Sequence, residues 1–134
     1  MATLRDETFP IRSSDDIVKI RQITRELTLM QAFSLVDQTK MVTAASELAR
    51  NVLEHGGGGD ARLEALQDGN RRGVRATFVD QGPGIPDLEK ALKDGFTTRD
   101  GMGLGLSGSK RLTNEFEIHT EVGKGTSVMI ARWK

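Results

Sequence analysis

The chain has 134 residues, a length that suits a single domain able to bury about two-thirds of the surface that its unfolded form exposes. Nineteen basic and nineteen acidic residues give a formal net charge of zero, which excludes a general electrostatic attraction to nucleic acid or to an anionic membrane. The absence of cysteine excludes disulfides and thiolate metal sites, and no apolar run is long enough to span a bilayer. We expect one soluble, cytoplasmic domain over residues 1–134, with a protein or a small molecule as its partner.

The first part of the chain predicts an edge strand and two amphipathic helices. Residues 8–12 form the expected strand, at a sheet edge because Pro10 cannot donate to a strand ladder. The first helix has Asp15 as its expected N-cap, and the second runs from residue 36 or 37 to 55, where the glycines at 56–59 end it. Their apolar stripes are Ile17, Ile20, Ile23, Leu27 and Met30 in the first helix, and Met41, Ala45, Leu48 and Val52 in the second.

From Asp60 onward the apolar period changes to two, which predicts two neighbouring antiparallel strands joined by a turn at residues 68–70. The further elements expected are a short helix over residues 86–92, a mobile polar segment over 95–103, a longer helix over 104–114, and a strand pair over 116–121 and 126–133 that turns at 123–125. About five strands and three or four helices partly segregate along the chain. This order favours an α+β two-layer sandwich over a doubly wound parallel sheet.

A polar stripe lies beside the apolar stripe of the second helix. Glu47, Asn51 and His55 follow one another at four-residue steps, so their side chains stack on one side of the helix. Carboxylate and carboxamide oxygens suit a divalent ion or a substrate hydroxyl, and Mg²⁺ prefers oxygen ligands. A solvated helix face would carry the same pattern, so the stripe alone leaves both interpretations open.

A glycine-rich turn follows the strand that ends near Asp80. Its sequence is Asp80-Gln81-Gly82-Pro83-Gly84-Ile85-Pro86. Gly82 and Gly84 permit positive φ and a close approach of the backbone to a flat ligand. The Asp80 carboxylate can accept a hydrogen bond from an exocyclic amine such as that of adenine. An ordinary turn remains the alternative for this motif by itself.

A second glycine loop precedes the third long helix. Gly101, Gly103 and Gly105 stand where free backbone N–H groups and the helix dipole favour phosphate. Residues 103–108 also spell the dinucleotide-binding pattern G-x-G-x-x-G, but that pattern requires a strand directly before it, and none is predicted there. Arg99, in the preceding polar segment, is a candidate to reach a phosphate.

With these clusters in this order, the chain resembles the GHKL superfamily of ATPases and kinases, which includes gyrase, Hsp90, histidine kinases and MutL. Residues 47–51 resemble its N box, residues 80–84 its first glycine box, residues 101–105 its second, and Gly125-Thr126 its terminal Gly-Thr element. The resemblance covers nearly the whole chain. It implies the Bergerat fold, a two-layer α/β sandwich whose mixed, mostly antiparallel sheet carries helices on one face, and it implies ATP and Mg²⁺ as cofactors.

Within that superfamily, the small size and the strings at residues 94–98 and 110–112 resemble the bacterial switch serine/threonine kinases of the RsbT type. No dimerisation helix with a phospho-accepting histidine is present. This resemblance implies phosphorylation of a STAS-domain protein in a partner-switching stress response, with a PP2C-type phosphatase or a sigma factor as a further partner. The string at residues 51–56 is similar to the N box of the anti-sigma factor kinases, where a histidine follows the asparagine.

The resemblance also implies roles for single residues. Glu47 would be the base that accepts the proton of the incoming hydroxyl, and Asn51 would hold Mg²⁺. Asp80 would bind the adenine amino group, with Thr126 supporting the adenine side. The full set expected to contact the nucleotide is Asn51, His55, Asp80, Gly82, Gly84, Ile85, Arg99, Gly101, Gly103, Leu104, Gly105, Leu106 and Thr126.

Two alternatives to a kinase stay open at the level of sequence. The first is an anti-sigma factor that sequesters a sigma factor or another regulator and uses the nucleotide only as a conformational ligand. The second is a free-standing ATPase without a protein acceptor.

Overall fold

The strands form one antiparallel sheet in the computed structural model, which describes residues 1–92 and 106–134. They lie in the order β1-β2-β3-β5-β4, and each of the four neighbouring pairs is antiparallel. The strands are β1 (Ala2–Ile11), β2 (Gly59–Asp68), β3 (Arg71–Asp80), β4 (Glu115–Glu121) and β5 (Gly125–Trp133). The described residues therefore confirm the expected five strands. A mixed sheet would contain at least one parallel pair, whereas all four pairs here are antiparallel.

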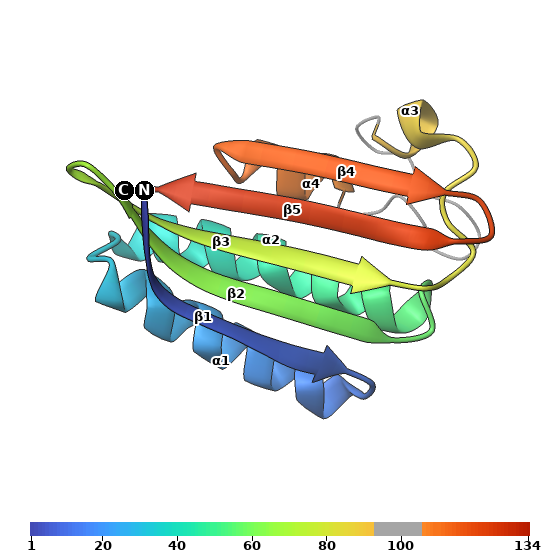
Figure 1. The fold of residues 1–134 in the computed structure, drawn as a ribbon, viewed down its shortest axis with the longest axis horizontal. Helices are drawn as coiled ribbons and strands as arrows, with labels where there is room; N and C mark the ends of the chain where they lie inside the picture. Colours follow the sequence, from blue (N-terminus) through green and yellow to red (C-terminus); the bar gives the residue numbers. More distant parts are fainter. Residues whose placement is uncertain (93–105) are drawn as a thin grey trace.

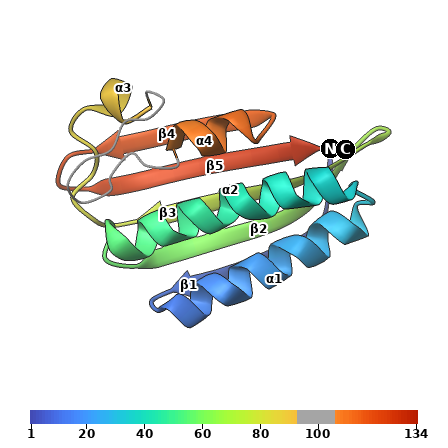
Figure 2. The same ribbon diagram turned by 180° about the vertical axis from the view of Figure 1, so that it is seen from behind.

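The helices cover one face of this sheet. Seen from behind, α1 (Ser14–Met30), α2 (Leu35–Glu54) and the short α4 (Leu106–Arg111) lie on the same side (Figure 2). The other face carries no helix in the part of the chain that the structure describes (Figure 1). This arrangement confirms the predicted α+β two-layer sandwich. None of the described helices is both long enough and apolar enough to cross a membrane.

The core lies between the sheet and α1 and α2, and the predicted apolar stripes build it except at Met30, which ends α1 and is 39% exposed. Side chains two apart in a strand point to the same face, so the alternating apolar residues of β2 and β3 all meet the helices. The buried residues that fulfil the prediction are Ile17, Ile20 and Leu27 of α1, Met41, Ala45, Leu48 and Val52 of α2, Ala61, Leu63 and Ala65 of β2, and Val74, Ala76 and Phe78 of β3.

The helix-free face of the sheet is held by ion pairs between neighbouring strands. Arg75 donates two hydrogen bonds to Glu64, both at 2.9 Å, and Arg62 donates two to Asp6 at 2.9 and 2.7 Å. Glu64 is only 2% exposed although the sequence pattern places it on the solvent side. Its burial is tolerated because Arg75 satisfies both carboxylate oxygens, and a buried charge without such a partner is strongly destabilising.

The start of α1 differs from the sequence expectation. The N-cap is Ser13 rather than Asp15, because the next carboxylate along, Asp16, folds back and accepts from the backbone N–H groups of Arg12 at 2.8 Å and Ser13 at 3.2 Å. Strand β1 is also longer than the five residues predicted for it. It is an edge strand, as Pro10 indicated.

Two further elements are shorter than predicted. Helix α3 spans Leu88–Ala91 because Asp87, one residue after Pro86, is its N-cap and accepts from the Lys90 N–H at 3.1 Å. Helix α4 ends at Arg111 rather than 114, because the chain already turns into the sheet at Asn114, whose side chain accepts from the Trp133 N–H at 2.6 Å. The segment predicted to be mobile, 95–103, and the expected helical positions 104 and 105 lie outside the described residues.

One end of the sandwich gathers the segments that the sequence singled out. The end of α2, the end of β3 and the β4–β5 turn lie together at one end, whereas both chain termini lie at the other (Figure 1).

Arg132 of β5 joins the sheet to the start of α2. Its guanidinium donates to the Asp37 carboxylate at 2.7 Å and to the Leu112 carbonyl at 2.8 Å. This hydrogen bond from Arg132 holds the pKa of Asp37 below its ordinary value, although partial burial opposes the shift. The carboxylate form of Asp37 is thus the form that stabilises the fold.

We therefore expect Asp37→Asn to lower the free energy of unfolding at pH 7 by about 1–2 kcal/mol, as for loss of a charged hydrogen bond. A group with a depressed folded-state pKa stabilises above its unfolded pKa and loses that effect as the pH falls through the folded pKa. The difference from wild type should consequently shrink on acidification below about pH 4 in denaturant titrations. Asp15→Asn is the matched control, since Asp15 also lies in a first helical turn but is exposed and makes no ion pair within the described residues. An equal loss in both variants would contradict the role of Arg132.

Candidate functional site

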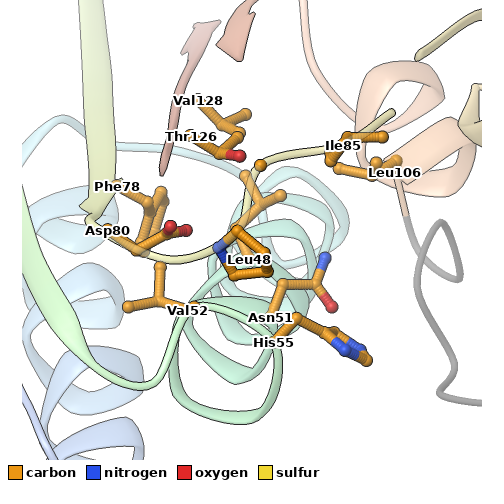
Figure 3. Close-up of a pocket in the computed structure, with 13 residues that line it drawn as sticks. Leu48, Asn51, Val52, His55, Phe78, Asp80, Ile85, Leu106, Thr126 and Val128 are labelled. Atoms are coloured by element: carbon orange, nitrogen blue, oxygen red, sulfur yellow. The ribbon is translucent and has the colours of Figure 1, made fainter. Parts of the chain in front are cut away.

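A pocket opens at the end of the sandwich where α2, β3 and β5 meet (Figure 3). The empty space in and in front of it, including solvent outside its mouth, is about 440 Å³. The residues that line it are Leu48, Asn51, Val52, His55, Gly56, Phe78, Asp80, Pro83, Gly84, Ile85, Leu106, Thr126 and Val128. Most of these side chains are apolar, with a few polar groups among them, which is the usual composition of a small-molecule site.

The register of the sheet builds this pocket as a continuation of the core. Phe78 of β3 pairs with Val128 of β5, and two residues further along Asp80 pairs with Thr126. Because side chains two apart share a face, Asp80 and Thr126 point to the same side as the buried pair. The apolar row thus becomes the pocket floor, and the next row adds a carboxylate and a hydroxyl (Figure 3).

The turn after β3 fixes the Asp80 carboxylate. The Gly82 N–H donates to one of its oxygens, Oδ1, at 2.9 Å, which leaves Oδ2 available to a ligand. Gly82 does not line the pocket but packs behind Asp80 against Gly56, where an added Cβ would stand 2.7 Å from the Gly56 Cα. Gly84 has a φ of +78°, and a Cβ there would come within 2.5 Å of the Glu121 carbonyl oxygen. Glycine is therefore required for the turn to fold this tightly against the end of β4.

The hydroxyls of Thr126 and Thr120 and the backbone N–H of Ile85 meet at one wall of the pocket. The Thr126 hydroxyl lies 2.9 Å from the hydroxyl of Thr120, which pairs with it across the β4–β5 hairpin. Thr120 also accepts from the Ile85 N–H at 2.8 Å. The first glycine turn and the hairpin are thereby tied together at the pocket wall.

Helix α2 supplies the opposite wall. Asn51 and His55 are one turn apart on the helix, and both line the pocket (Figure 3). The Asn51 carboxamide is half-buried and makes no side-chain hydrogen bond within the described residues, so its oxygen is available as a ligand. Those residues contain no cluster of three histidine or acidic side chains able to hold a metal alone. The donor set fits Mg²⁺ only when phosphate oxygens complete the coordination, which is the usual way that Mg²⁺ binds with nucleotides.

Glu47 does not line this pocket. It lies one turn before Asn51 and lines a separate hollow between α1 and α2, whose wall includes Arg21, Arg25 and Arg50. Arg50 donates to its carboxylate at 2.8 Å. The polar stripe predicted on α2 is therefore divided in the structure, with Asn51 and His55 in the pocket and Glu47 beside it.

The remaining predicted site residues divide into two groups. Gly84, Ile85, Leu106 and Thr126 line the pocket as expected. Arg99, Gly101, Gly103, Leu104 and Gly105 lie outside the described residues.

Thr120 is the polar residue beside the site that sequence reasoning missed. The expected turn at 123–125 did not indicate it, because that turn is centred on residue 124, whereas the hairpin that pairs Thr120 with Thr126 is centred on residue 123. Paired positions in a hairpin face the same side. Leu48, Val52 and Phe78 were predicted for the core, and in the structure they also form the apolar wall of the pocket.

Comparison with known proteins places this geometry in a family. The family model described as histidine kinase-, DNA gyrase B- and HSP90-like ATPase matches residues 36–134. The chain is 42% identical over 118 residues to the serine/threonine-protein kinase RsbT of Bacillus subtilis (strain 168), covering 88% of this chain and 89% of that protein. It is also 33% identical over 97 residues to an anti-sigma F factor of Thermoanaerobacter sp. (strain X514), covering 68% of this chain and 66% of that protein.

Solved structures agree on the fold. A Mycobacterium tuberculosis protein containing RsbU and RsbW domains superposes with a TM-score of 0.64 at 21% identity, over 96% of this chain and 31% of that one. The catalytic domain of the histidine kinase ThkA superposes with a TM-score of 0.55 at 17% identity, over 94% of this chain and 95% of that one. With a family match over most of its length and a relative of 42% identity, the chain belongs to the family of histidine kinase-, DNA gyrase B- and HSP90-like ATPases.

Proposed function

We propose that the protein is a Mg-ATP-dependent serine/threonine kinase that phosphorylates a STAS-domain partner in a bacterial partner-switching circuit. The observation that carries the proposal is the convergence of Asp80, Thr126 and Asn51 on one pocket from three separate elements. The similarity to the kinase RsbT supports the reaction class, because it extends over 88% of this chain.

The pocket suits a purine base at its inner end. Apolar side chains from α2, β3 and β5 offer flat surfaces to the ring, and the free Oδ2 of Asp80 can accept from an exocyclic amine. The glycine backbone at Gly84 brings no side chain between the base and the turn. The ring would lie on the floor made by Phe78 and Val128.

The phosphates would extend from the base past Asn51. The Asn51 carboxamide oxygen would hold Mg²⁺ together with phosphate oxygens, and the ion would neutralise the charge of the phosphates. Asn51 has no competing hydrogen bond within the described residues that must be broken first. His55, one turn further along, would border the same end of the nucleotide.

Glu47 would accept the proton of the acceptor hydroxyl. In that step the hydroxyl oxygen forms a bond to the γ-phosphorus, the bond from that phosphorus to the bridging oxygen breaks, and ADP leaves. The position of Glu47 outside the pocket but one turn from Asn51 suits an acceptor that approaches from the α1–α2 side. Such a reaction depends mostly on positioning and charge neutralisation.

The adenine assignment depends on the carboxylate of Asp80. Asp80→Asn replaces the carboxylate with a carboxamide. In one orientation its NH₂ group faces the adenine amine, so that two donors meet, and ATP affinity should fall by about 100-fold. Because the carboxylate serves the ligand rather than the core, the thermal transition of the free protein should stay within a few degrees of wild type. Titration calorimetry with ATP, alongside thermal unfolding, measures both. Wild-type ATP affinity in a folded variant would remove the adenine assignment.

Substitution of Glu47 separates catalysis from ATP binding. Glu47→Gln should reduce phosphate transfer to the partner by about 100-fold or more while ATP affinity changes less than about threefold, since Glu47 lies outside the pocket. Transfer of labelled phosphate from ATP to a purified STAS-domain protein provides the measurement. Glu54→Gln is the matched control, because Glu54 is an exposed carboxylate on the same helix. Normal transfer by Glu47→Gln would refute the role of this residue as the base.

A second candidate function is an anti-sigma factor that binds a sigma factor and uses the nucleotide as a conformational ligand. It is favoured by the 33% identity to an anti-sigma F factor and by the placement of His55 at the pocket, where the sequence resembles the N box of that group. Co-purification with a sigma factor that survives Glu47→Gln, without transfer to any STAS-domain protein, would select this function over the kinase.

A further inference from the structure

The hollow between α1 and α2 that contains Glu47 carries more positive than negative charge. The two helices lie side by side (Figure 2), and the charged side chains that line the hollow between them are Arg21 and Arg25 of α1 and Glu47 and Arg50 of α2. Three guanidiniums and one carboxylate leave an excess of positive charge. The whole chain has a formal net charge of zero, so this excess is local to the hollow.

Two of the three arginines have no counter-charge within the described residues. Arg21 and Arg25 are exposed, and their guanidiniums make no hydrogen bond or ion pair there. Glu26 follows Arg25 in the sequence but does not line the hollow. Because Arg21 and Arg25 are four residues apart on one helix, their like charges repel each other. An anion supplied from outside the chain would relieve this repulsion.

The third arginine holds Glu47. Arg50 donates to the Oε1 atom of Glu47 at 2.8 Å, and both side chains are partly exposed, Arg50 at 44% and Glu47 at 34%. An ion pair as exposed as this one adds little to stability. Arg50 can therefore exchange Glu47 for another carboxylate at low cost, and the pair is a contact that a docking partner can replace.

The shape of the hollow suits a peptide segment better than a small ion. Its lining residues on α2 extend from Thr39 to Arg50, a length of about 17 Å along the helix axis. The hydroxyl side chains of Thr39, Thr43 and Ser46 also line it. None of the three arginines lines the nucleotide pocket, so the phosphates of ATP are not the anion expected here.

Docking and phosphate transfer change the charge of the hollow in a way that its own residues do not balance. An acceptor protein that covers the hollow removes water from the guanidiniums, and a buried charge without a partner is strongly destabilising. When Glu47 accepts the proton of the hydroxyl, its negative charge is lost, and three guanidiniums remain without a carboxylate. A carboxylate of the acceptor restores the balance, because arginine binds such a group through two parallel hydrogen bonds.

We propose that the hollow binds an acidic segment of the acceptor protein beside the hydroxyl that is phosphorylated, and that Arg50 passes from Glu47 to a carboxylate of this segment. Arg50 thus determines which acceptor is used, and Arg25 provides a further contact for the same segment. The inference rests on the proposed kinase function and adds the chemical class of its protein substrate.

Substitution of Arg50 tests whether the hollow binds the acceptor. Calorimetric titration with a purified STAS-domain protein gives the affinity, and initial rates of labelled phosphate transfer from ATP give KM and kcat. We expect Arg50→Gln to weaken binding and raise KM for this acceptor by about tenfold, while kcat and ATP affinity change less than about threefold. Arg50→Lys keeps the charge and should recover most of the effect. Arg5→Gln is the matched control, because it also breaks an exposed arginine–glutamate pair, but on β1 and outside the hollow.

A double-mutant cycle identifies the carboxylate of the acceptor. Mass spectrometry of the labelled product locates the phosphorylated hydroxyl, and each Asp or Glu near it in sequence is changed to Asn or Gln. We expect one of these changes to raise KM by about tenfold with the wild-type kinase, but by less than about twofold with Arg50→Gln, because the contact is then already lost. Independent effects at every acidic position would reject the contact with Arg50.

Other outcomes would also overturn the inference. If Arg50→Gln binds the acceptor as tightly as Arg5→Gln does, the hollow is not a docking site. If kcat falls while KM and binding are unchanged, Arg50 acts on Glu47 alone. Should Arg50→Gln not fold, Arg25→Gln gives the same comparison, since its guanidinium has no partner within the described residues.

The two proposals fail separately. Transfer that depends on Glu47 but not on Arg50 or Arg25 rejects only the acidic docking site. Binding of the STAS-domain protein that depends on Arg50, without any phosphate transfer, rejects the kinase function and retains the hollow as a site for an acidic partner.

Discussion

The antiparallel register of β3, β5 and β4 is the constraint on which the rest of the site depends. Because Phe78 pairs with Val128, strand geometry requires Asp80 to pair with Thr126 on the same face two residues later, and the hairpin then places Thr120 next in the row. If one of these strands slipped by one residue against its neighbour, every side chain of the slipped strand would turn to the other face of the sheet. The pairs that fill the core thus also orient the polar groups of the pocket.

The glycines near the site follow from the same register. Gly125 has a φ of +115°, and a Cβ there would stand 2.2 Å from the Asp80 carbonyl oxygen, so β5 can begin this close to the end of β3 only with glycine. Gly84 meets the end of β4 under a similar restriction. Because both close approaches occur where strands end, the backbone itself forms part of the pocket wall. A ligand can then contact the turn without displacing side chains.

Sequence patterns predicted those parts of the structure that depend on local spacing. The stripe of α2, the turn after Asp80 and the hairpin at 123–125 each follow from residues a few positions apart, and the pocket forms where they meet. The sequence did not show that Glu64 is buried on the helix-free face, because its burial depends on Arg75 from the neighbouring strand. Asp15 was predicted as the N-cap in place of Ser13, because the cap depends on Asp16 folding back to accept from the backbone N–H groups before the helix, which the residue pattern does not show.

The division of α2 between two hollows explains how one scaffold can serve two kinds of function. Glu47 and Asn51 are a single turn apart, yet Asn51 lines the pocket with Asp80 while Glu47 faces the groove toward α1 and is paired with Arg50. If the proposed function holds, a change at position 47 would remove phosphate transfer without altering any group that lines the pocket. A partner protein that binds against α1 and α2 would contact Glu47 directly. A bound nucleotide would influence that partner only through Asn51 and helix α2. Under the two proposed functions, a kinase and a nucleotide-dependent binding protein would differ at the α1–α2 groove, while the pocket lined by Asp80 and Asn51 would serve both in the same way.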